Sequence, residues 1–277
     1  MELFTCGSRS EIPVDVINKF DGVVGGYFWG DWESPTPREV AKKYQKTKIR
    51  NGFLYGNKHT NPDLSSGCAT IEDWILKKIR LNAYVNQWVL VNEFINERDN
   101  FNPYPNYDIE NLKRYFAITN KVNPDAELII GDFRPHQLKR WQKIKAICEQ
   151  LLSENIPIHG VGIQVHFKTR NAHSRIPGVP YILDALPAVI KLFDGVLPVH
   201  LIEVSGWHHY SEKPEVLTPL WDEVLAIAST GNVASFCPWW LNEDDVGYPR
   251  KMPTFEEFLG AGIFDKDWNQ KLRLPAV

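Results

Sequence analysis

The chain has 277 residues, which is enough to bury one large hydrophobic core and close to the usual size of a (β/α)8 barrel domain. Its 31 basic and 34 acidic side chains nearly cancel, to a net charge of -3, so the charge gives no reason to expect nucleic acid or an anionic membrane surface as a partner. Ten Trp, ten Tyr and fourteen Phe are more aromatic residues than a core alone requires, and we expect some of them to line a groove that stacks on a ligand.

The cysteines are spread widely and form no Cys-x-x-Cys pair, which argues against a zinc ribbon or a redox motif and favours buried free thiols at Cys6, Cys68, Cys148 and Cys237. No apolar run approaches the length of a membrane span. The first residues, Met1–Cys6, lack the basic and long apolar regions of a signal peptide. We therefore expect a protein that is either intracellular or secreted after loss of a leader, and that acts as a monomer without a cofactor.

Short apolar segments alternate with helix signals along the whole chain. Strands are expected at Leu3–Cys6, Gly22–Phe28, Lys48–Tyr55, Gln87–Glu93, Glu127–Asp132, Ile158–His166, Val196–Glu203 and Val233–Trp240. Helices are expected at Ser10–Phe20, from Thr36 onward, and at Ile71–Leu81 (capped by Thr70), Tyr107–Val122, Leu138–Leu152, Ile182–Phe193, Glu215–Ser229 and Thr254–Leu259. Eight such alternations, with no linker or low-complexity segment, predict a single (β/α)8 TIM barrel that forms one domain over residues 1–277.

A doubly wound open sheet is the alternative to a barrel for alternating strands and helices. That fold would want a glycine-rich dinucleotide turn after the first strand, and the residues there, Cys6–Ser10, do not form one. The barrel is therefore the favoured architecture.

The stretch Gln87–Glu93 carries the first chemical signal. Its continuous apolar run reads as a strand buried on both faces, and it ends in the polar pair Asn92 and Glu93. Packing explains such a pair poorly, whereas the carboxyl ends of the strands are where barrel enzymes place their active sites. We therefore interpret Glu93 as a candidate catalytic acid.

Glu203 is the expected partner of Glu93. It is a lone acid in the apolar seventh strand, at the same end of the barrel and nearly opposite the fourth strand. Two carboxyl groups that flank a bond are what glycoside hydrolysis needs, one to protonate the leaving oxygen and one to attack the anomeric carbon. The plain alternative for either residue alone is a glutamate paired with a core Arg or Lys, and the occurrence of both acids, together with Asn92, argues against it.

The sixth strand adds Gln164 and His166, which share one face by the two-residue period of a strand. One of them could hold a sugar hydroxyl while the other hydrogen-bonds the nucleophile. The alternative is a Gln and a His that are satisfied within the core.

These motifs resemble those of glycoside hydrolase family 10, the retaining endo-β-1,4-xylanases. Trp88–Glu93 is similar to the family's Trp-Asp-Val-Val-Asn-Glu motif, and Gly160–His166 is similar to its Gly-x-Gly-x-Gln-x-His strand. Val199–Glu203 is similar to the Val-His-Ile-Thr-Glu strand that carries the family's nucleophile. Weaker similarities lie at Asn123–Leu128, Gly131–Phe133, Phe264–Asp265, Asn269 and Lys271.

The resemblance implies a role for each of these residues. Glu93 would be the acid/base and Glu203 the nucleophile. Asn92 would hydrogen-bond the 2-hydroxyl of the sugar at the cleavage point, His166 would bind Glu203, and Gln164 would lie beside them. The partner would be a polysaccharide or oligosaccharide, with xylan as the leading substrate.

The first half of the chain departs from the family pattern. The family's Glu-Asn-x-x-Lys-Trp segment is absent after the second strand, and its Trp-His is replaced by Gly56 and Asn57, with His59 close enough to substitute. Ser205 stands where the family has an Asp that supports the histidine, which predicts that this support is missing. At the eighth strand, Trp239 and Trp240 are the aromatic residues we expect to stack on sugar.

Other classes of protein fit less well. A metal-dependent barrel hydrolase would want His-x-His on the first strand, which is absent, so no metal site is expected. A phosphate-binding barrel would want more glycine than Ser205-Gly206 supplies after the seventh strand. The alternatives that stay open are a non-catalytic or weakly active carbohydrate-binding barrel and a retaining β-glycosidase with another sugar preference.

Overall fold

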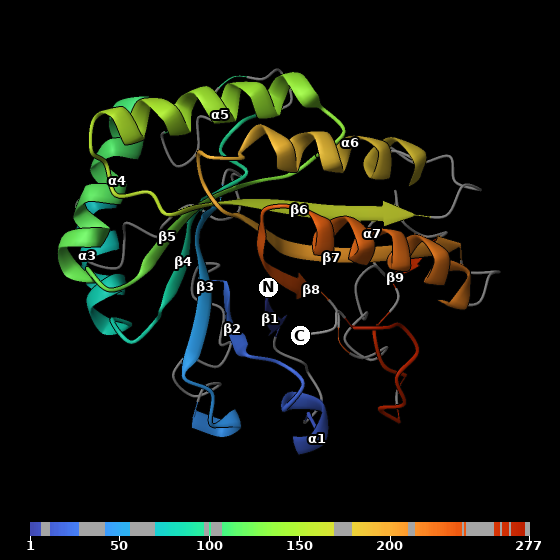
Figure 1. Cartoon of the computed structure of the whole chain (residues 1–277). Helices are drawn as coiled ribbons and strands as arrows, with labels where there is room; N and C mark the ends of the chain where they lie inside the picture. Colours follow the sequence, from blue (N-terminus) through green and yellow to red (C-terminus); the bar gives the residue numbers. More distant parts are fainter. Residues whose placement is uncertain are drawn as a thin grey trace.

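The computed structural model of the protein describes residues 1–6, 12–27, 42–55, 70–96, 100, 107–168, 179–209, 214–239, 241, 258–260, 262–265 and 267–274. Eight parallel strands form a closed barrel, in which each strand pairs with the next in the chain and β8 pairs back onto β1 (Figure 1). The strands are β1 (Glu2–Cys6), β2 (Gly22–Tyr27), β3 (Lys48–Tyr55), β4 (Gln87–Asn92), β5 (Glu127–Asp132), β6 (Gly160–Lys168), β7 (Val199–His209) and β8 (Val233–Pro238). The (β/α)8 barrel expected from the sequence is confirmed.

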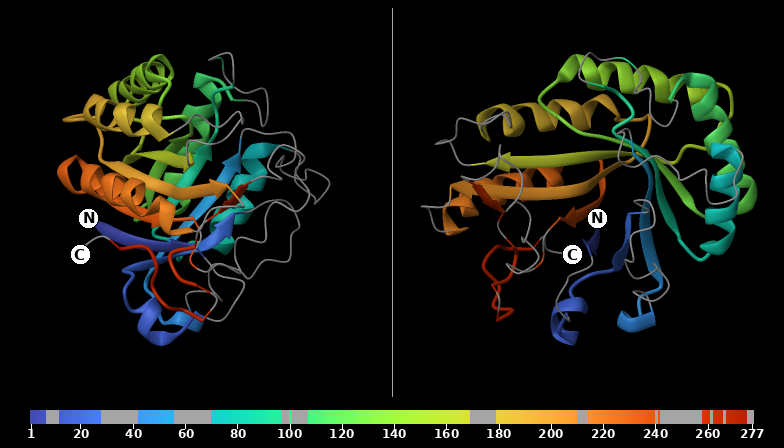
Figure 2. Two further views of the ribbon diagram at one scale, coloured as in Figure 1. Left: turned by 90° about the vertical axis from the view of Figure 1, so that its right-hand side faces the viewer. Right: turned by 180° about the vertical axis from the view of Figure 1, so that it is seen from behind.

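Helices α3 to α7 form an outer layer around the strands (Figure 2). The helices are α1 (Val14–Ile17), α3 (Ile71–Leu81), α4 (Ile109–Val122), α5 (Leu138–Ser153), α6 (Val179–Leu192) and α7 (Thr218–Thr230), with the 3-10 turn η2 (Pro214–Leu217) before α7. Thr70 caps α3 as expected, since its side chain accepts a hydrogen bond from the amide of Asp73 at 3.1 Å. None of the described helices is both long and apolar enough to cross a membrane.

Three expected elements differ from the structure. The helix expected over Ser10–Phe20 is only α1 in the described residues, because Pro13 holds an extended backbone immediately before it. The seventh strand continues well past Glu203 to His209, where it pairs with a short antiparallel strand, β9 (Phe258–Gly260). The prediction that Thr254–Leu259 is a helix is therefore wrong at its end, since Phe258 pairs with His209. The helix expected from Thr36 falls outside the described residues.

Two clusters of apolar side chains fill the barrel interior. Their members come only from strands and are separate from the main core, which packs the strands against the helices. The clusters are Phe4, Val24 and Cys237, and Val89, Ile129 and Ile202. Cys148 and Cys237 are buried thiols, as expected for them.

The amino-terminal end of the barrel is closed by a buried polar layer. Arg50, which is 1% exposed, donates through Nε and Nη2 to Oε1 of Gln87 at 3.0 and 2.7 Å and also hydrogen-bonds Ser235. His200 lies 2.8 Å from Oγ of Ser235 and 3.4 Å from Nη2 of Arg50. Burial, together with the Arg50 charge, lowers the pKa of His200 to about 3, so its ring is neutral at pH 7. We call this layer the polar floor. It lies at the end of the barrel opposite the carboxyl ends of the strands.

Candidate active site

Glu93 and Glu203 are brought together at the carboxyl end of the barrel. Glu93 directly follows β4, and Glu203 lies within β7. The side-chain amide of Gln164, on β6, bridges the two: its Nε2 donates to Oε1 of Glu93 at 3.2 Å and to Oε1 of Glu203 at 3.3 Å. One nitrogen therefore holds an oxygen of each carboxyl group, and both groups face the same space.

The predicted neighbours of Glu203 surround its carboxylate. Nδ2 of Asn92 donates to Oε1 of Glu203 at 3.5 Å, and Nε2 of His166 lies 3.6 Å from Oε2. Asn92 is completely buried and Glu203 is 5% exposed, so these amide contacts take the place of water around the carboxylate. The structure thus gathers Asn92, Gln164 and His166 around Glu203.

Ser205, which replaces the aspartate that usually supports the histidine, contacts His166 itself. Oγ of Ser205 lies 2.6 Å from Nδ1 of His166. In the tautomer whose proton lies on Nε2, toward the Glu203 carboxylate, Nδ1 accepts a hydrogen bond from the Ser205 hydroxyl. A hydroxyl orients the ring as an aspartate would, but it carries no charge.

An irregularity in β7 explains how Glu203 reaches the site. Along the pairing of β6 with β7, Ile163 lies opposite Leu201 and Gln164 lies opposite Glu203, so Ile202 is an extra residue in β7. In a regular strand Ile202 and Glu203 would point to opposite faces. With the bulge, Ile202 packs in the barrel interior while Glu203 still contacts Gln164.

The backbone at Glu93 is unusual. Its φ of 53° lies in the left-handed region. This conformation costs a non-glycine residue about 1–3 kcal/mol and persists only where neighbouring contacts hold it. The amide of Glu93 donates to the carbonyl oxygen of Gly131 at 3.1 Å and to Oδ1 of Asn92 at 3.2 Å. This turn ends β4 and directs the Glu93 side chain toward Gln164.

The pKa of Glu93 is raised to about 7, first by burial and then by the charges of Glu203 and Asp132. The hydrogen bond from Gln164 and the more distant Arg140 charge act in the opposite direction and limit this rise. A carboxyl group that keeps its proton near neutral pH, beside a second carboxyl group held by amide donors, is an arrangement suited to an acid and a nucleophile.

Two residues near the site carried no predicted role. Asp132, at the end of β5, and Arg140, on α5, form a fully buried ion pair with a 2.6 Å contact. The sequence could have indicated Arg140, because it lies on the apolar side of a helix that also buries Trp141 and Ile144. A cation buried there requires an acid nearby. The signal for Asp132 was a carboxylate at the end of a buried strand.

Gly131, on β5, leaves room for Asn92. A Cβ at position 131 would lie 2.6 Å from Oδ1 of Asn92 and 3.0 Å from side-chain atoms of Val89 and Ile202. We expect Gly131→Ala to displace the Asn92 amide from Glu203 and to lower kcat/KM for glycoside hydrolysis by about 10- to 100-fold. Steady-state kinetics on a xylo-oligosaccharide would measure this loss.

Gly162→Ala is the matched control for Gly131→Ala. A Cβ at position 162 would crowd Ile202 at 2.9 Å and Ile129 at 3.3 Å in the same interior layer, and its three nearest atoms all belong to these two isoleucines. We expect each variant to lose about 1–3 kcal/mol of stability through overpacking. The fall in kcat/KM should be larger in Gly131→Ala. Equal kinetic losses in the two variants would contradict the role given to Gly131.

The remaining predicted site residues fall in two groups. Trp239 directly follows β8, is half-buried, and its amide donates to the carbonyl oxygen of Val204 at 2.8 Å, so its backbone lies beside Glu203 at the rim of the site. Asn57, His59 and Trp240 lie outside the described residues. In the described part of the chain, no group of three or more His, Cys, Asp or Glu side chains is placed to hold a metal ion.

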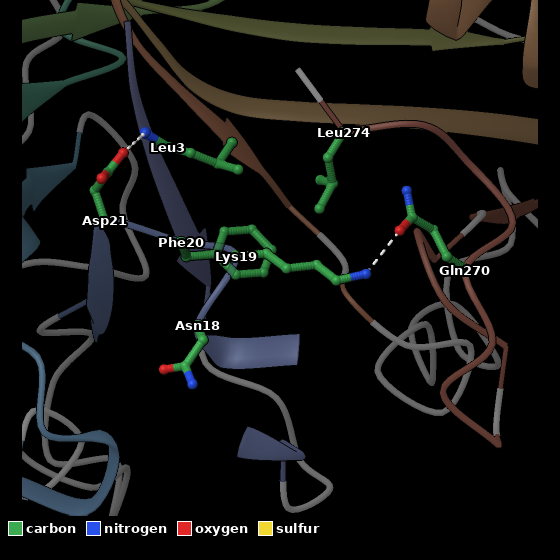
Figure 3. Close-up of a pocket in the computed structure, with 7 residues that line it drawn as sticks. All are labelled: Leu3, Asn18, Lys19, Phe20, Asp21, Gln270 and Leu274. Carbon is green, nitrogen blue, oxygen red and sulfur yellow. Dashed lines mark hydrogen bonds between the residues drawn. The ribbon is translucent and has the colours of Figure 1, made fainter. Parts of the chain in front are cut away.

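A hollow of about 370 Å³ lies away from these residues, where β1 starts. Figure 3 shows its lining, with Lys19 donating to Gln270 at 2.9 Å and Asp21 accepting from the amide of Leu3 at 2.8 Å. Leu3 and Leu274 bring β1 and the last described segment together there. The hollow lies beside the amino-terminal ends of β1 and β2, so it is separate from the candidate active site.

Comparison with known proteins identifies the family of the chain. The family model described as "Glycosyl hydrolase family 10" matches residues 38–190, more than half of the chain. A beta-1,4-xylanase of Dictyoglomus thermophilum is 32% identical over 88 residues, which are 30% of this chain and 25% of that protein. The endo-1,4-beta-xylanase A of Caldicellulosiruptor sp. (strain Rt8B.4) is 28% identical over 211 residues, 69% of this chain and 28% of that protein. The matched segments therefore span little more than a quarter of these relatives' own length.

Solved structures show the same fold over almost the whole chain. Xylanase 10B of Thermotoga petrophila, in complex with xylobiose, superposes with a TM-score of 0.73 at 15% identity, over 98% of this chain and 90% of that one. Native xylanase 10B of Thermotoga maritima superposes with a TM-score of 0.75 at 14% identity, over 98% and 91% of the two chains. By the match of its sequence to the family model, the chain belongs to glycosyl hydrolase family 10.

Proposed function

We propose that the protein is a retaining glycoside hydrolase that cleaves β-1,4-linked xylan or xylo-oligosaccharides by double displacement. The observation that carries the proposal is the bridge from Gln164 to both Glu93 and Glu203. The oxygens that share this donor can be no farther apart than the sum of its two hydrogen-bond lengths. Retaining enzymes hold their carboxyl groups about 5–5.5 Å apart, and inverting enzymes roughly 6.5–9.5 Å apart, so the bridge favours retention.

In the first step, the Glu203 carboxylate attacks the anomeric carbon while Glu93 gives its proton to the departing glycosidic oxygen. The bond from the anomeric carbon to that oxygen breaks, and an ester between the sugar and Glu203 forms. Because the pKa of Glu93 is about 7, a large share of the acid, about half at pH 7, carries the proton that this step requires.

In the second step, the Glu93 carboxylate takes a proton from water, and the water oxygen attacks the anomeric carbon and releases Glu203. Two displacements return the sugar to its original configuration. In this mechanism Asn92 would bind the 2-hydroxyl of the sugar, and the position of its buried amide beside Glu203 supports that role. Trp239, at the rim, and the predicted residues Asn57, His59 and Trp240 would bind sugar beyond the cleavage point.

The choice of xylan rests on relatives. Those described above are named as xylanases, and the Thermotoga petrophila structure contains xylobiose.

We also propose that residues 1–277 act as one catalytic domain and as a monomer.

Proton NMR of the first products released from xylo-oligosaccharides tests the proposal. Retention predicts that the β-anomer appears first and that the α-anomer appears only later by mutarotation. Initial release of the α-anomer would contradict the assignment of Glu203 as nucleophile. Binding of xylo-oligosaccharides without any hydrolysis, on aryl glycosides as well, would instead support a non-catalytic carbohydrate-binding barrel.

A further inference from the structure

Two fully buried charged side chains lie beside the segment that follows Glu93. Oδ1 of Asp132 accepts hydrogen bonds from Nε and Nη2 of Arg140 at 3.0 and 2.6 Å, and both side chains are 0% exposed. A buried ion pair adds little net stability over apolar residues of similar volume. Stability alone is therefore a weak explanation for this pair.

The other hydrogen bonds of the pair go to the backbone after Glu93. Oδ2 of Asp132 accepts from the amide of Ile95 at 3.2 Å, and Nη2 of Arg140 donates to the carbonyl oxygen of Ile95. Nη1 of Arg140 donates to the carbonyl oxygen of Asn96 at 2.9 Å. Both backbone polar groups of Ile95, two residues after Glu93, are thus bound to the pair.

These contacts hold the far side of the left-handed turn at Glu93. On the near side, the Glu93 amide is bound to the carbonyl oxygen of Gly131, the residue before Asp132. A backbone in this sparsely populated region persists only when its surroundings hold it. The end of β5 therefore binds the Glu93 amide directly through Gly131. On the other side of the turn, Asp132 and Arg140 together bind the backbone of Ile95.

We propose that Asp132 and Arg140 are positioning residues for the acid/base, which fix the turn at Glu93 so that its carboxyl group faces Gln164 and Glu203. This inference rests on the proposed function, because it assigns the pair a role in proton donation by Glu93.

The guanidinium group suits this role better than an ammonium group. Arg140 reaches the carboxylate of Asp132 and two different carbonyl oxygens with its three nitrogens. The single nitrogen of a lysine, on a flexible stem, cannot reach all of these oxygens at once. Arg140→Lys therefore keeps the charge of the pair and removes part of its hold on the Ile95 and Asn96 carbonyls.

The charges of the pair also act on Glu93. The groups that act on the Glu93 carboxyl are Glu203 from β7 and Gln164 from β6, which face it, and the charges of Asp132 from β5 and Arg140 from α5. The buried Tyr107, just before α4, is in turn influenced by the charge of Glu93. Asp132 raises the pKa of Glu93 and Arg140 lowers it. Loss of the Asp132 charge should lower the pKa of Glu93, because one raising influence is gone and the charge of Arg140 is no longer compensated.

The first experiment compares two leaving groups in Arg140→Lys. A poorly placed acid slows substrates whose leaving oxygen must be protonated and spares those with very good leaving groups. We expect kcat/KM to fall about 10- to 100-fold on xylotetraose, and by less than about threefold on 2,4-dinitrophenyl β-xylobioside. Because the ratio of the two values is taken within one preparation, it does not depend on how much of the protein is folded.

Arg50→Lys is the matched control. Arg50 is also a buried arginine, but it lies in the polar floor at the other end of the barrel. We expect this variant to lose thermal stability as Arg140→Lys does, while its ratio between the two substrates stays at the wild-type value.

The second experiment is the pH profile of Asp132→Asn on xylotetraose. The alkaline limb of kcat/KM should move to lower pH than in the wild type. An unmoved limb in Asp132→Asn, or equal losses on both substrates in Arg140→Lys, would overturn the inference. Failure of the wild type to hydrolyse either substrate would instead reject the proposed function itself, so the two failures are distinguishable.

Discussion

Glu203→Gln should reduce the hydrolysis of every glycoside substrate by roughly 10⁴-fold or more. The amide is close to the carboxylate in size but cannot attack the anomeric carbon, so no ester forms, however good the leaving group is. Asn92, Gln164 and His166 already surround this side chain, so the site should keep its shape. The measurement is initial rate on xylotetraose and on 2,4-dinitrophenyl β-xylobioside.

Two controls separate loss of the nucleophile from loss of the fold. The melting temperature of Glu203→Gln should stay near that of the wild type, and calorimetry should show that xylotetraose still binds. Mass spectrometry after brief reaction of the wild type with a slow 2-fluoro glycoside should find the sugar attached to Glu203. Attachment to another residue, or residual turnover above about one hundredth of the wild-type rate, is inconsistent with a nucleophile at this position.

Glu93→Ala should give a loss that depends on the leaving group. On xylotetraose, whose leaving oxygen needs a proton, kcat/KM should fall by about 10³-fold. On 2,4-dinitrophenyl β-xylobioside the first step needs no acid, so kcat/KM should change little while the second step slows for want of a base. A burst of dinitrophenol followed by slow turnover is the expected result, and added azide should accelerate the slow phase because azide attacks the ester without a general base.

The pH dependence of the wild type provides a further check on Glu93. Burial and the charge of Glu203 raise the pKa of this carboxyl to about 7. The protonated form donates in the first step, so kcat/KM on xylotetraose should fall as the pH rises through about 7. This alkaline limb should be absent in Glu93→Ala. If the limb persists, another group supplies the proton; if azide fails to accelerate the variant, Glu93 does not act as the base.

Regular structure followed from local sequence where each segment had one dominant signal. The bounds of β3, β5 and α3 match the expected ranges, because each is a clear apolar run or an amphipathic stretch with a capping residue. Strand β7 continues beyond its expected end because residues 204–207 pair with β6 and residues 207–209 pair with β9, which lies about fifty residues later in the chain. Pairing at that distance in sequence leaves no periodic signal in the strand itself.

The candidate site likewise contains residues that the sequence predicts and contacts that it does not. An isolated acid at the end of a buried strand is conspicuous in the sequence, so Glu93 and Glu203 could be predicted from their positions alone. The support given by Ser205 to His166 could not, since a hydroxyl in a strand is chemically ordinary until the neighbouring strand brings the imidazole within 2.6 Å. Likewise, Arg140 acquires its role only because α5 folds back over the end of β5.

By itself, then, the sequence determined the barrel, the order of its strands and the two glutamates, because alternating apolar segments and lone buried acids are local properties of a chain. The tertiary structure decided how those acids meet. The extra residue Ile202 brings Glu203 into the site, the left-handed turn aims Glu93, and Gln164 joins the two carboxyl groups. Each of these features arises from contacts between segments that are far apart in the sequence, and their geometry is set only when the barrel closes.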